Sequence, residues 1–194
     1  MRILGISGSL RRDSHNTALL RAAAELVPPE DELVVFDGVK DVPAYDEDDE
    51  GEPLPAAVAA LVTAVAEADA VLFATPEYNA SVPGALKNAL DWASRPLATN
   101  VFRNKPVAVI GSSAGMFGAV WAQAELRKVL AAMGARVAEV EVAVGRVGER
   151  FDDGRLNDDE VRQELRDALA TLSAEGAPAL PADPSAPRPL PVAA

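Results

Sequence analysis

The sequence contains no cysteine and only one histidine, His15. Without cysteine there can be no disulfide, no thiolate nucleophile and no metal site built on cysteine ligands. With a single histidine the chain cannot form a histidine-rich metal site, and a Ser-His-Asp triad could be built only around His15. These absences exclude cysteine-dependent enzymes and weigh heavily against hydrolases.

Positive charge is also scarce, because 18 Lys and Arg stand against 30 Asp and Glu and the formal net charge is −12. Nucleic acids and acidic membranes are therefore not expected as partners, since both require a basic surface. No apolar run reaches membrane-spanning length, and residues 1–7 enter a strand pattern without the features of a signal peptide. We expect a cytoplasmic protein with no membrane partner.

What the sequence does contain is a regular alternation of short apolar runs and longer helical patterns. Strands are predicted at residues 2–7, 32–36, 70–74, 106–110 and 136–142. Helices are predicted at residues 16–27, 55–66, 83–92, 117–133 and 158–172. This alternation predicts an α/β domain in which helices cover both faces of a parallel sheet. The domain covers residues 1–176, and the Ala- and Pro-rich residues 177–194 are interpreted as a disordered tail.

Ligands of such sheets bind beyond the carboxyl ends of the strands, so the loop at residues 8–17 is the first candidate site. It is rich in hydroxyl and amide donors and includes Arg11, whose guanidinium suits phosphate oxygens. The helix that follows adds free N–H groups and the positive end of its dipole. The loop is neither Gly-x-Gly-x-x-Gly nor a Walker loop. We interpret it as a phosphate-binding loop, although a solvated loop with Ser14 or Asn16 as helix cap is the structural alternative.

Two further loops follow the third and fourth predicted strands. Residues 75–84 contain Pro76 and Pro83, which stiffen the loop so that its backbone can face the polar edge of a flat heterocycle. A rigid crossover with local turns is the alternative. Residues 111–118 are mostly small, which lets a planar ligand approach the backbone closely. Taken alone, this third loop is more simply explained as a flexible connection.

Together these loops resemble the NADPH-dependent FMN reductase family, which includes bacterial quinone and chromate reductases, over about residues 2–175. The first matching segment is Gly8-Ser9-Leu10-Arg11, followed by Ser14-His15-Asn16. The second and more specific one is Pro76-Glu77-Tyr78-Asn79, followed by Ser81-Val82-Pro83-Gly84, Leu86-Lys87-Asn88 and Asp91-Trp92. The resemblance implies a flavodoxin-like three-layer sandwich with a five-stranded parallel sheet in the order 2-1-3-4-5.

The resemblance also implies an FMN-dependent oxidoreductase that takes electrons from NADPH or NADH and passes them to a quinone, free flavin or similar small acceptor. It places the FMN phosphate at the first loop and the isoalloxazine edge against the other two. The implied FMN-binding residues are Ser9, Arg11, Ser14, His15, Asn16, Thr17, Pro76, Glu77, Tyr78, Asn79, Ser112, Ser113 and Gly115. No catalytic side chain and no metal is expected, because the flavin itself carries the redox chemistry.

Two positions depart from the pattern of the family. His15 stands where members often have an aromatic residue, and Trp121 replaces the arginine of a Gly-Gly-x-Arg-x-Gln segment. That segment helps to form subunit contacts in the family, so the resemblance implies a homodimer or homotetramer. Trp121 is interpreted either as a core residue or as an anchor across a two-fold interface.

Two other functions compete with this interpretation. A flavodoxin-type electron carrier would suit the acidity of the chain, because acidic surfaces dock basic redox partners. Flavodoxins, however, usually enclose the flavin ring between aromatic residues, and Tyr78 is the only Phe, Tyr or Trp among the implied FMN-binding residues. A non-redox interaction module is the second alternative, because a fold does not by itself determine a function.

Overall fold

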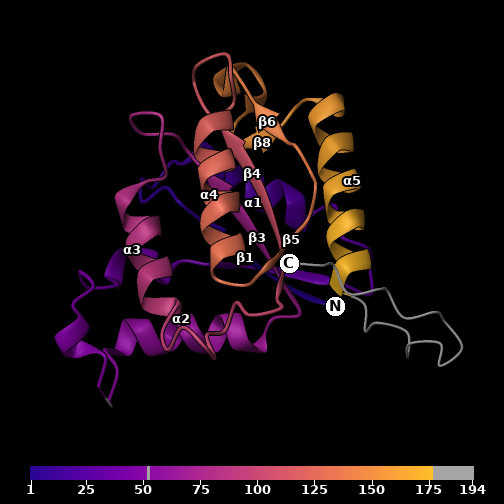
Figure 1. Cartoon of the computed structure of the whole chain (residues 1–194). Helices are drawn as coiled ribbons and strands as arrows, with labels where there is room; N and C mark the ends of the chain where they lie inside the picture. The colour runs from indigo at the N-terminus through magenta and orange to yellow at the C-terminus, as the bar shows by residue number, and fades with distance from the viewer. Residues whose placement is uncertain (52, 177–194) are drawn as a thin grey trace, which may run out of the picture.

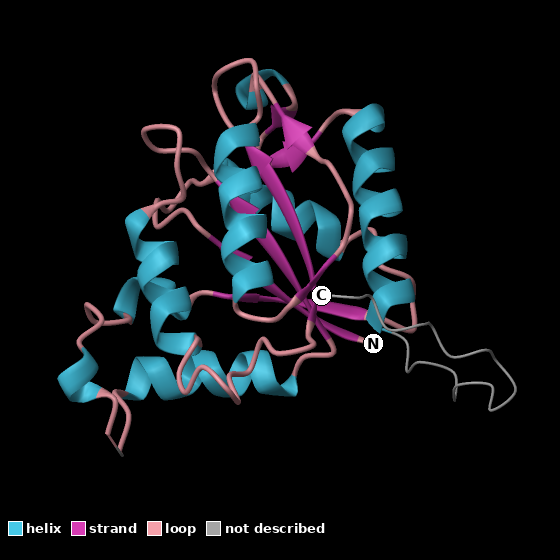
Figure 2. Ribbon diagram, viewed as in Figure 1, coloured by secondary structure: helices cyan, strands magenta, loops and turns pink. Residues whose placement is uncertain are grey.

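The computed structural model describes residues 1–51 and 53–176, and the tail predicted at residues 177–194 lies outside them. It shows a twisted sheet between two layers of helices (Figures 1 and 2). The parallel strands follow the order β2-β1-β3-β4-β5, and a further short strand, β6, pairs with β4. The predicted fold class and strand order are therefore confirmed.

The elements have the following bounds. The main sheet consists of β1 (Arg2–Ser7), β2 (Glu32–Phe36), β3 (Ala70–Thr75), β4 (Pro106–Ser112), β5 (Arg136–Val137) and β6 (Ala143–Val144). The helices are α1 (His15–Ala24), α2 (Ala56–Glu67), α3 (Gly84–Ala93), α4 (Val120–Ala132) and α5 (Asp159–Gly176). A small hairpin of β7 (Phe151–Asp152) and β8 (Arg155–Leu156), which the sequence did not predict, precedes α5.

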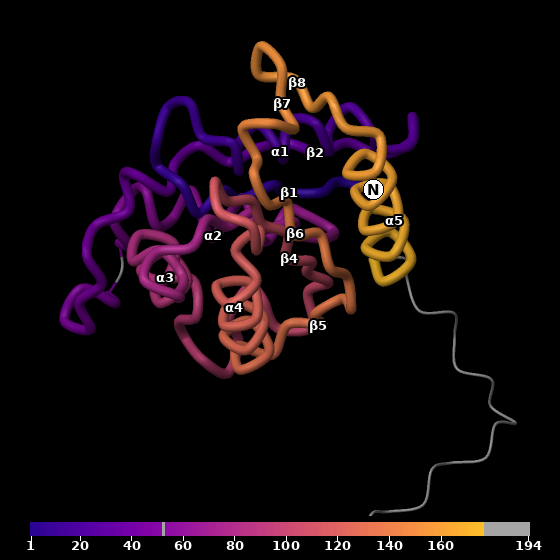
Figure 3. The backbone as a smooth tube through the Cα atoms, turned by 90° about the horizontal axis from the view of Figure 1, so that it is seen from above, coloured from indigo at the N-terminus to yellow at the C-terminus, as the bar shows by residue number. Residues whose placement is uncertain are grey.

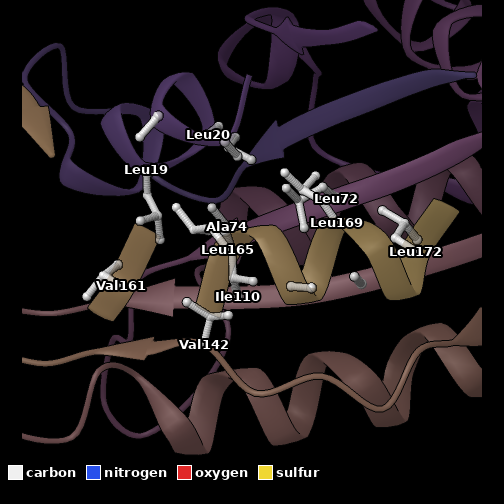
Figure 4. Packing of buried hydrophobic residues seen from close by; sticks show 14 of the residues in the cluster. Leu19, Leu20, Leu72, Ala74, Ile110, Val142, Val161, Leu165, Leu169 and Leu172 are labelled. Atoms are coloured by element: carbon white, nitrogen blue, oxygen red, sulfur yellow. The ribbon is translucent and has the colours of Figure 1, made fainter. Parts of the chain in front are cut away.

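Two apolar cores lie on the two faces of the sheet. Helices α1 and α5 cover one face, and α2, α3 and α4 cover the other (Figure 3). Figure 4 shows the first core, where Leu165 of α5 lies between Leu19 of α1 and the sheet residue Ile110, and Leu169 lies beside Leu72 of β3. Full burial of each such side chain stabilises the fold by about 1.5–3 kcal/mol. None of the helices in the described part of the chain combines the length and apolar character needed to cross a bilayer.

The strand predicted at residues 136–142 is wrong over residues 138–142, because the ladder with β4 breaks between the bonds from Ala138 N–H to Val107 O (2.8 Å) and from Gly111 N–H to Val142 O (2.9 Å). The Arg127 guanidinium enters the gap, and its Nη2 donates to the carbonyl oxygens of Val109 (3.1 Å) and Val140 (2.7 Å). Burial lowers the pKa of Arg127 from its ordinary value. The N–H of Val140 turns back to the carbonyl of Ala138 at 3.0 Å. A side chain from α4 thus replaces the backbone pairing that the apolar pattern predicted.

The start of α4 also differs from the helix predicted at residues 117–133. Gly118 and Ala119 adopt φ values of +57° and +64°, so the helix begins at Val120. A residue in this left-handed region cannot be part of a right-handed helix. The loop after β4 therefore extends to Ala119, beyond the predicted start of the helix at residue 117.

Candidate functional site

A cavity of about 340 Å³ opens where the loops after β1, β3 and β4 meet. The strand order reverses between β1 and β3, which is the point where doubly wound sheets bind ligands. The volume falls in the range of about 300–1,000 Å³ that is typical of small-molecule sites. The lining residues are Ser9, Arg11, Ser14, His15, Asn16, Pro76, Glu77, Tyr78, Ser112, Ser113, Ala114 and Val147. The structure thus brings the three predicted loops together around one cavity.

The loop between β1 and α1 offers hydrogen-bond donors to one end of this cavity. Ser14 is the N-cap of α1, and its Oγ accepts from the N–H of Thr17 at 3.2 Å. Within the described residues the N–H groups of His15 and Asn16 have no hydrogen-bond partner. The exposed guanidinium of Arg11 lies in the same loop and donates to the carbonyl of Asp13. Free N–H groups at a helix start and a nearby guanidinium are the groups that bind phosphate in proteins.

The side chain of Asn16 holds two of the loops together. Its Nδ2 donates to the carbonyl of Ser112 at 3.1 Å, and its Oδ1 accepts from the N–H of Ser112 at 2.9 Å. Both residues are buried. Each end of the amide makes one bond to Ser112, and the backbone N–H of Asn16 has no partner among the described residues and can donate to a ligand. The sequence showed the donor but could not show this partner, which lies 96 positions away.

Ser112 has a buried hydroxyl group without a hydrogen-bond partner in the described part of the chain. Its side chain is 2% exposed, and its Oγ has no hydrogen-bond partner among the described residues. Buried hydroxyl groups are almost always paired, so an unpaired one in a cavity wall calls for an explanation. A polar group of a bound molecule would supply the partner.

The loop after β3 forms a tight turn at the rim of the cavity. Tyr78 and Ser81 exchange two backbone hydrogen bonds of 3.1 Å each. Between them Asn79 and Ala80 have φ values of +55° and +59°, the pattern of a type I′ turn. Alanine rarely adopts this conformation, and such local strain is common at ligand sites. The turn leaves Tyr78 54% exposed beside the cavity.

Glu77 joins this turn to the helix that follows the third loop. Its Oε2 accepts from the backbone N–H groups of Trp121 (3.2 Å) and Ala122 (3.3 Å). The N-cap residue Ala119 has no side chain that could do this. A carboxylate at the positive end of a helix is stabilising. Glu77 therefore fixes the second loop against α4 in addition to lining the cavity.

Three predicted residues do not line the cavity, and two unpredicted ones do. Thr17 donates from its hydroxyl to Ser7 Oγ at 3.0 Å, while Asn79 and Gly115 lie outside the lining. Ala114 and Val147 are the two additions. Val147 is an apolar residue that follows β6 among the charged residues Arg146, Glu149 and Arg150, so its own residue type gave no indication of a ligand.

One sequence signal does point to the segment that carries Val147. A Cβ at Gly145 would lie 2.2 Å from the carbonyl oxygen of Met116. Glycine is therefore required for the segment after β6 to pack against the third loop. Within the described residues no group of three or more potential ligands is placed to hold a metal ion.

Comparison with known proteins places this chain in a family. The sequence model described as NADPH-dependent FMN reductase matches residues 1–149. The chain belongs to this family. An NAD(P)H-dependent FMN reductase from Pseudomonas aeruginosa is 43% identical over 174 residues, which cover 89% of this chain and 93% of the relative. A 2-hydroxy-1,4-benzoquinone reductase from Burkholderia is 44% identical over 131 residues, 68% of this chain and 70% of the relative.

Among solved structures, the flavoenzyme FerB, an NAD(P)H:(acceptor) oxidoreductase from Paracoccus denitrificans, is similar over 90% of this chain and 98% of its own. The TM-score is 0.80 and the identity is 32%. These findings confirm the predicted NADPH-dependent FMN reductase family, the class of enzyme and the use of FMN with a nicotinamide nucleotide.

The cavity of this FMN reductase fits the cofactor by its own chemistry. The unpaired N–H groups of His15 and Asn16 can donate to the oxygens of a phosphate at one end. Ser112 lines the cavity, and its unpaired buried hydroxyl can donate to a polar group elsewhere on the ligand. The small residues Ser113 and Ala114 leave room for a flat ring beside the backbone.

Proposed function

We propose that this FMN reductase oxidises NADPH or NADH and delivers the electrons to a quinone or to free flavin. The unpaired buried hydroxyl of Ser112, a residue that lines the loop cavity, carries the proposal, because a polar group of a bound flavin can supply its missing partner. FMN, when bound, supplies the chemistry of accepting a hydride and passing the electrons on. We also propose a cytoplasmic location, since the reductant comes from the nucleotide pool of the cell.

The residues of the chain bind and orient rather than react. The first loop holds the phosphate, Asn16 keeps that loop at a fixed distance from the end of β4, and Glu77 fixes the rim. Tyr78 and Ala114 are exposed at the mouth of the cavity. This open side allows a nicotinamide and then an acceptor to approach the same surface in turn.

The function is tested with protein loaded with FMN. Anaerobic addition of NADPH or NADH is expected to bleach the flavin absorbance, and a quinone is then expected to restore it. Steady-state rates with both substrates varied are expected to give the parallel double-reciprocal lines of a ping-pong mechanism. If neither nucleotide changes the flavin absorbance, the proposed function is refuted. If the bleached absorbance recovers only slowly with every quinone and flavin tried, only the proposed class of acceptor is refuted.

The phosphate site is tested with Arg11→Ala. Loss of a hydrogen bond to a charged group is expected to weaken FMN binding by about 1.5–3 kcal/mol. Riboflavin lacks the phosphate, so its affinity is expected to stay the same in the variant. Fluorescence titration of both flavins measures the two effects, and Arg103→Ala, an exposed arginine near the other end of the sheet, is the control. An equal loss for FMN and riboflavin would show that Arg11 does not bind the phosphate.

We propose further that the protein is at least a homodimer that uses the start of α4. Trp121 is 51% exposed, so the alternative interpretation as a core residue is wrong. Phe117 and Met116 are 55% and 63% exposed, and the rings of Phe117 and Trp121 are in edge contact with centroids 5.1 Å apart. Exposed apolar side chains gathered in this way mark interaction surfaces.

Truncation of an interface anchor costs at least about 2 kcal/mol, so Trp121→Ala is expected to raise the dimer dissociation constant at least about 30-fold. Sedimentation at low concentration measures the shift, and turnover is expected to fall with it. Leu97→Ala is the control, because Leu97 is 57% exposed but lies between α3 and β4 at the amino end of the sheet. A wild-type protein that is fully active as a monomer would contradict the proposal.

A further inference from the structure

A second cavity of about 300 Å³ lies on the other side of the loop between β1 and α1. It is bounded by this loop, by α1 and by the end of β2, and it shares Ser9 and Arg11 with the flavin cavity. The lining residues are Ser7, Ser9, Leu10, Arg11, Arg12, Thr17, Arg21, Val35, Phe36, Asp37, Val39 and Lys40. The function described above does not use this cavity.

The cavity gathers positive charge in a protein that has little of it. Four of the 18 Lys and Arg of the chain line it, although the net charge of the whole chain is −12. The side chains of Arg12, Arg21 and Lys40 make no hydrogen bond or ion pair with any residue that the structure describes. Asp37 is the one carboxylate among the lining residues. Like charges held together without partners repel each other, and an anion placed between them relieves the repulsion.

The rest of the wall suits a nucleoside. Val35, Phe36 and Val39 provide an apolar surface against which a flat base can pack. The hydroxyl groups of Ser7 and Thr17, which are hydrogen-bonded to each other at 3.0 Å, lie at the opposite wall and can bond a sugar or phosphate. An apolar wall beside a cluster of cations fits a phosphorylated nucleoside better than a free inorganic anion.

We propose that this second cavity binds the adenosine 2′-phosphate end of NADPH, and that Arg12, Arg21 and Lys40 make the enzyme prefer NADPH to NADH. The inference rests on the proposed function, because it gives that reaction its preferred reductant. A dinucleotide lying across the shared loop reaches both cavities, with Arg11 between them. The 2′-phosphate then lies among the guanidinium and ammonium groups, which bind phosphate oxygens through charge-assisted hydrogen bonds.

The test is calorimetric titration of FMN-loaded protein with adenosine 2′,5′-bisphosphate and with adenosine 5′-monophosphate. The bisphosphate is expected to bind at least tenfold more tightly to the wild type, and Arg21→Glu is expected to abolish the difference. The same variant is expected to raise KM for NADPH at least tenfold and to leave kcat, KM for NADH and FMN content unchanged. Arg103→Glu, which makes the same charge change on an exposed arginine outside both cavities, is the control.

A second test uses a variant that is expected to bind the bisphosphate more tightly, because a misfolded protein would not show tighter binding. Asp37→Asn removes the only carboxylate of the lining and is expected to tighten bisphosphate binding at least threefold. Equal affinities for both adenosine phosphates, or no response to either variant, would overturn the proposal. If inorganic phosphate binds as tightly as the bisphosphate, the cavity is a simple anion site. If Arg21→Glu loses its FMN, the cavity belongs to the flavin site. Either result would overturn the proposal. Selective binding without bleaching by either nucleotide would support the cavity assignment and refute only the proposed function.

Discussion

Asn16→Asp is expected to destabilise the protein by about 3 kcal/mol and to abolish tight FMN binding. The carboxylate cannot donate to the carbonyl of Ser112, and a buried polar pair that loses one partner costs more than the hydrogen bond was worth. The loops after β1 and β4 then separate at the centre of the flavin cavity. Urea denaturation measures the first effect and flavin fluorescence the second. The destabilisation is expected to shrink at low pH, because a protonated carboxyl group can again donate to the carbonyl.

Asn88→Asp is the matched control for this change. The side chain of Asn88 makes the same kinds of bond to the backbone. Its Nδ2 donates to the carbonyl of Pro43 at 2.7 Å, and its Oδ1 accepts from the N–H of Tyr45 at 2.8 Å. Asn88 is only partly buried and does not line the flavin cavity, so water can solvate the new charge. We expect a cost of about 1 kcal/mol and normal FMN binding. Equal effects of the two variants would show that Asn16 has no special role at the site.

Gly118→Ala is expected to have a comparably large effect, through backbone geometry. Its φ is +57°, and a Cβ would lie 2.2 Å from the carbonyl carbon of Ala143 in β6. The clash is with backbone atoms, so β6 must move away from the end of β4, where Ser112 pairs with Val144. We expect a loss of about 3 kcal/mol in the free energy of unfolding, from overpacking and left-handed strain together. FMN affinity is expected to fall as well, because Ser112 lines the cavity.

Gly154→Ala separates the two causes. Gly154 has a φ of +77°, but nothing lies within 4 Å of its added Cβ. This variant therefore reports the cost of left-handed strain alone, about 1–2 kcal/mol, and should leave flavin binding intact. Urea denaturation and flavin titration of both variants provide the comparison. If Gly118→Ala costs no more than Gly154→Ala, the close approach of the loop to β6 is not needed for stability.

The architecture was predictable because it depends on local patterns. The strands β1, β3 and β4 are fully or almost fully buried, so their sequences are continuous apolar runs that indicate a parallel sheet. Residues 138–142 show why the same rule fails at the edge. Their apolar alternation is that of a strand, but the Arg127 guanidinium occupies the space where pairing would occur. When a side chain from another part of the chain takes the place of a backbone hydrogen-bond partner, the local sequence pattern does not reveal it.

The site was predictable to the extent that it consists of loops at strand ends. The strand order alone brings residues 8–17, 75–84 and 111–118 together, so residue types in these loops could be assigned to one ligand. The roles within the loops were less accessible, because they depend on contacts between segments. Asn16 and Glu77 were expected at the ligand and do line the cavity, but their side chains also connect neighbouring segments, which the sequence did not indicate. Val147 enters the cavity from a segment whose position depends on the break in the fifth strand.

The broken fifth strand also limits how this sheet can associate with other chains. A long, regular edge strand exposes a row of unpaired N–H and C=O groups, on which a strand of another molecule can add. Here the edge is reduced to β5 and β6, each of two residues, and the N–H and C=O of Val140 between them are already bonded. Glu139 and Glu141 are exposed on either side and add charge repulsion. This edge of the sheet is thereby protected against aggregation through strand addition, and β2 alone keeps an edge of regular length.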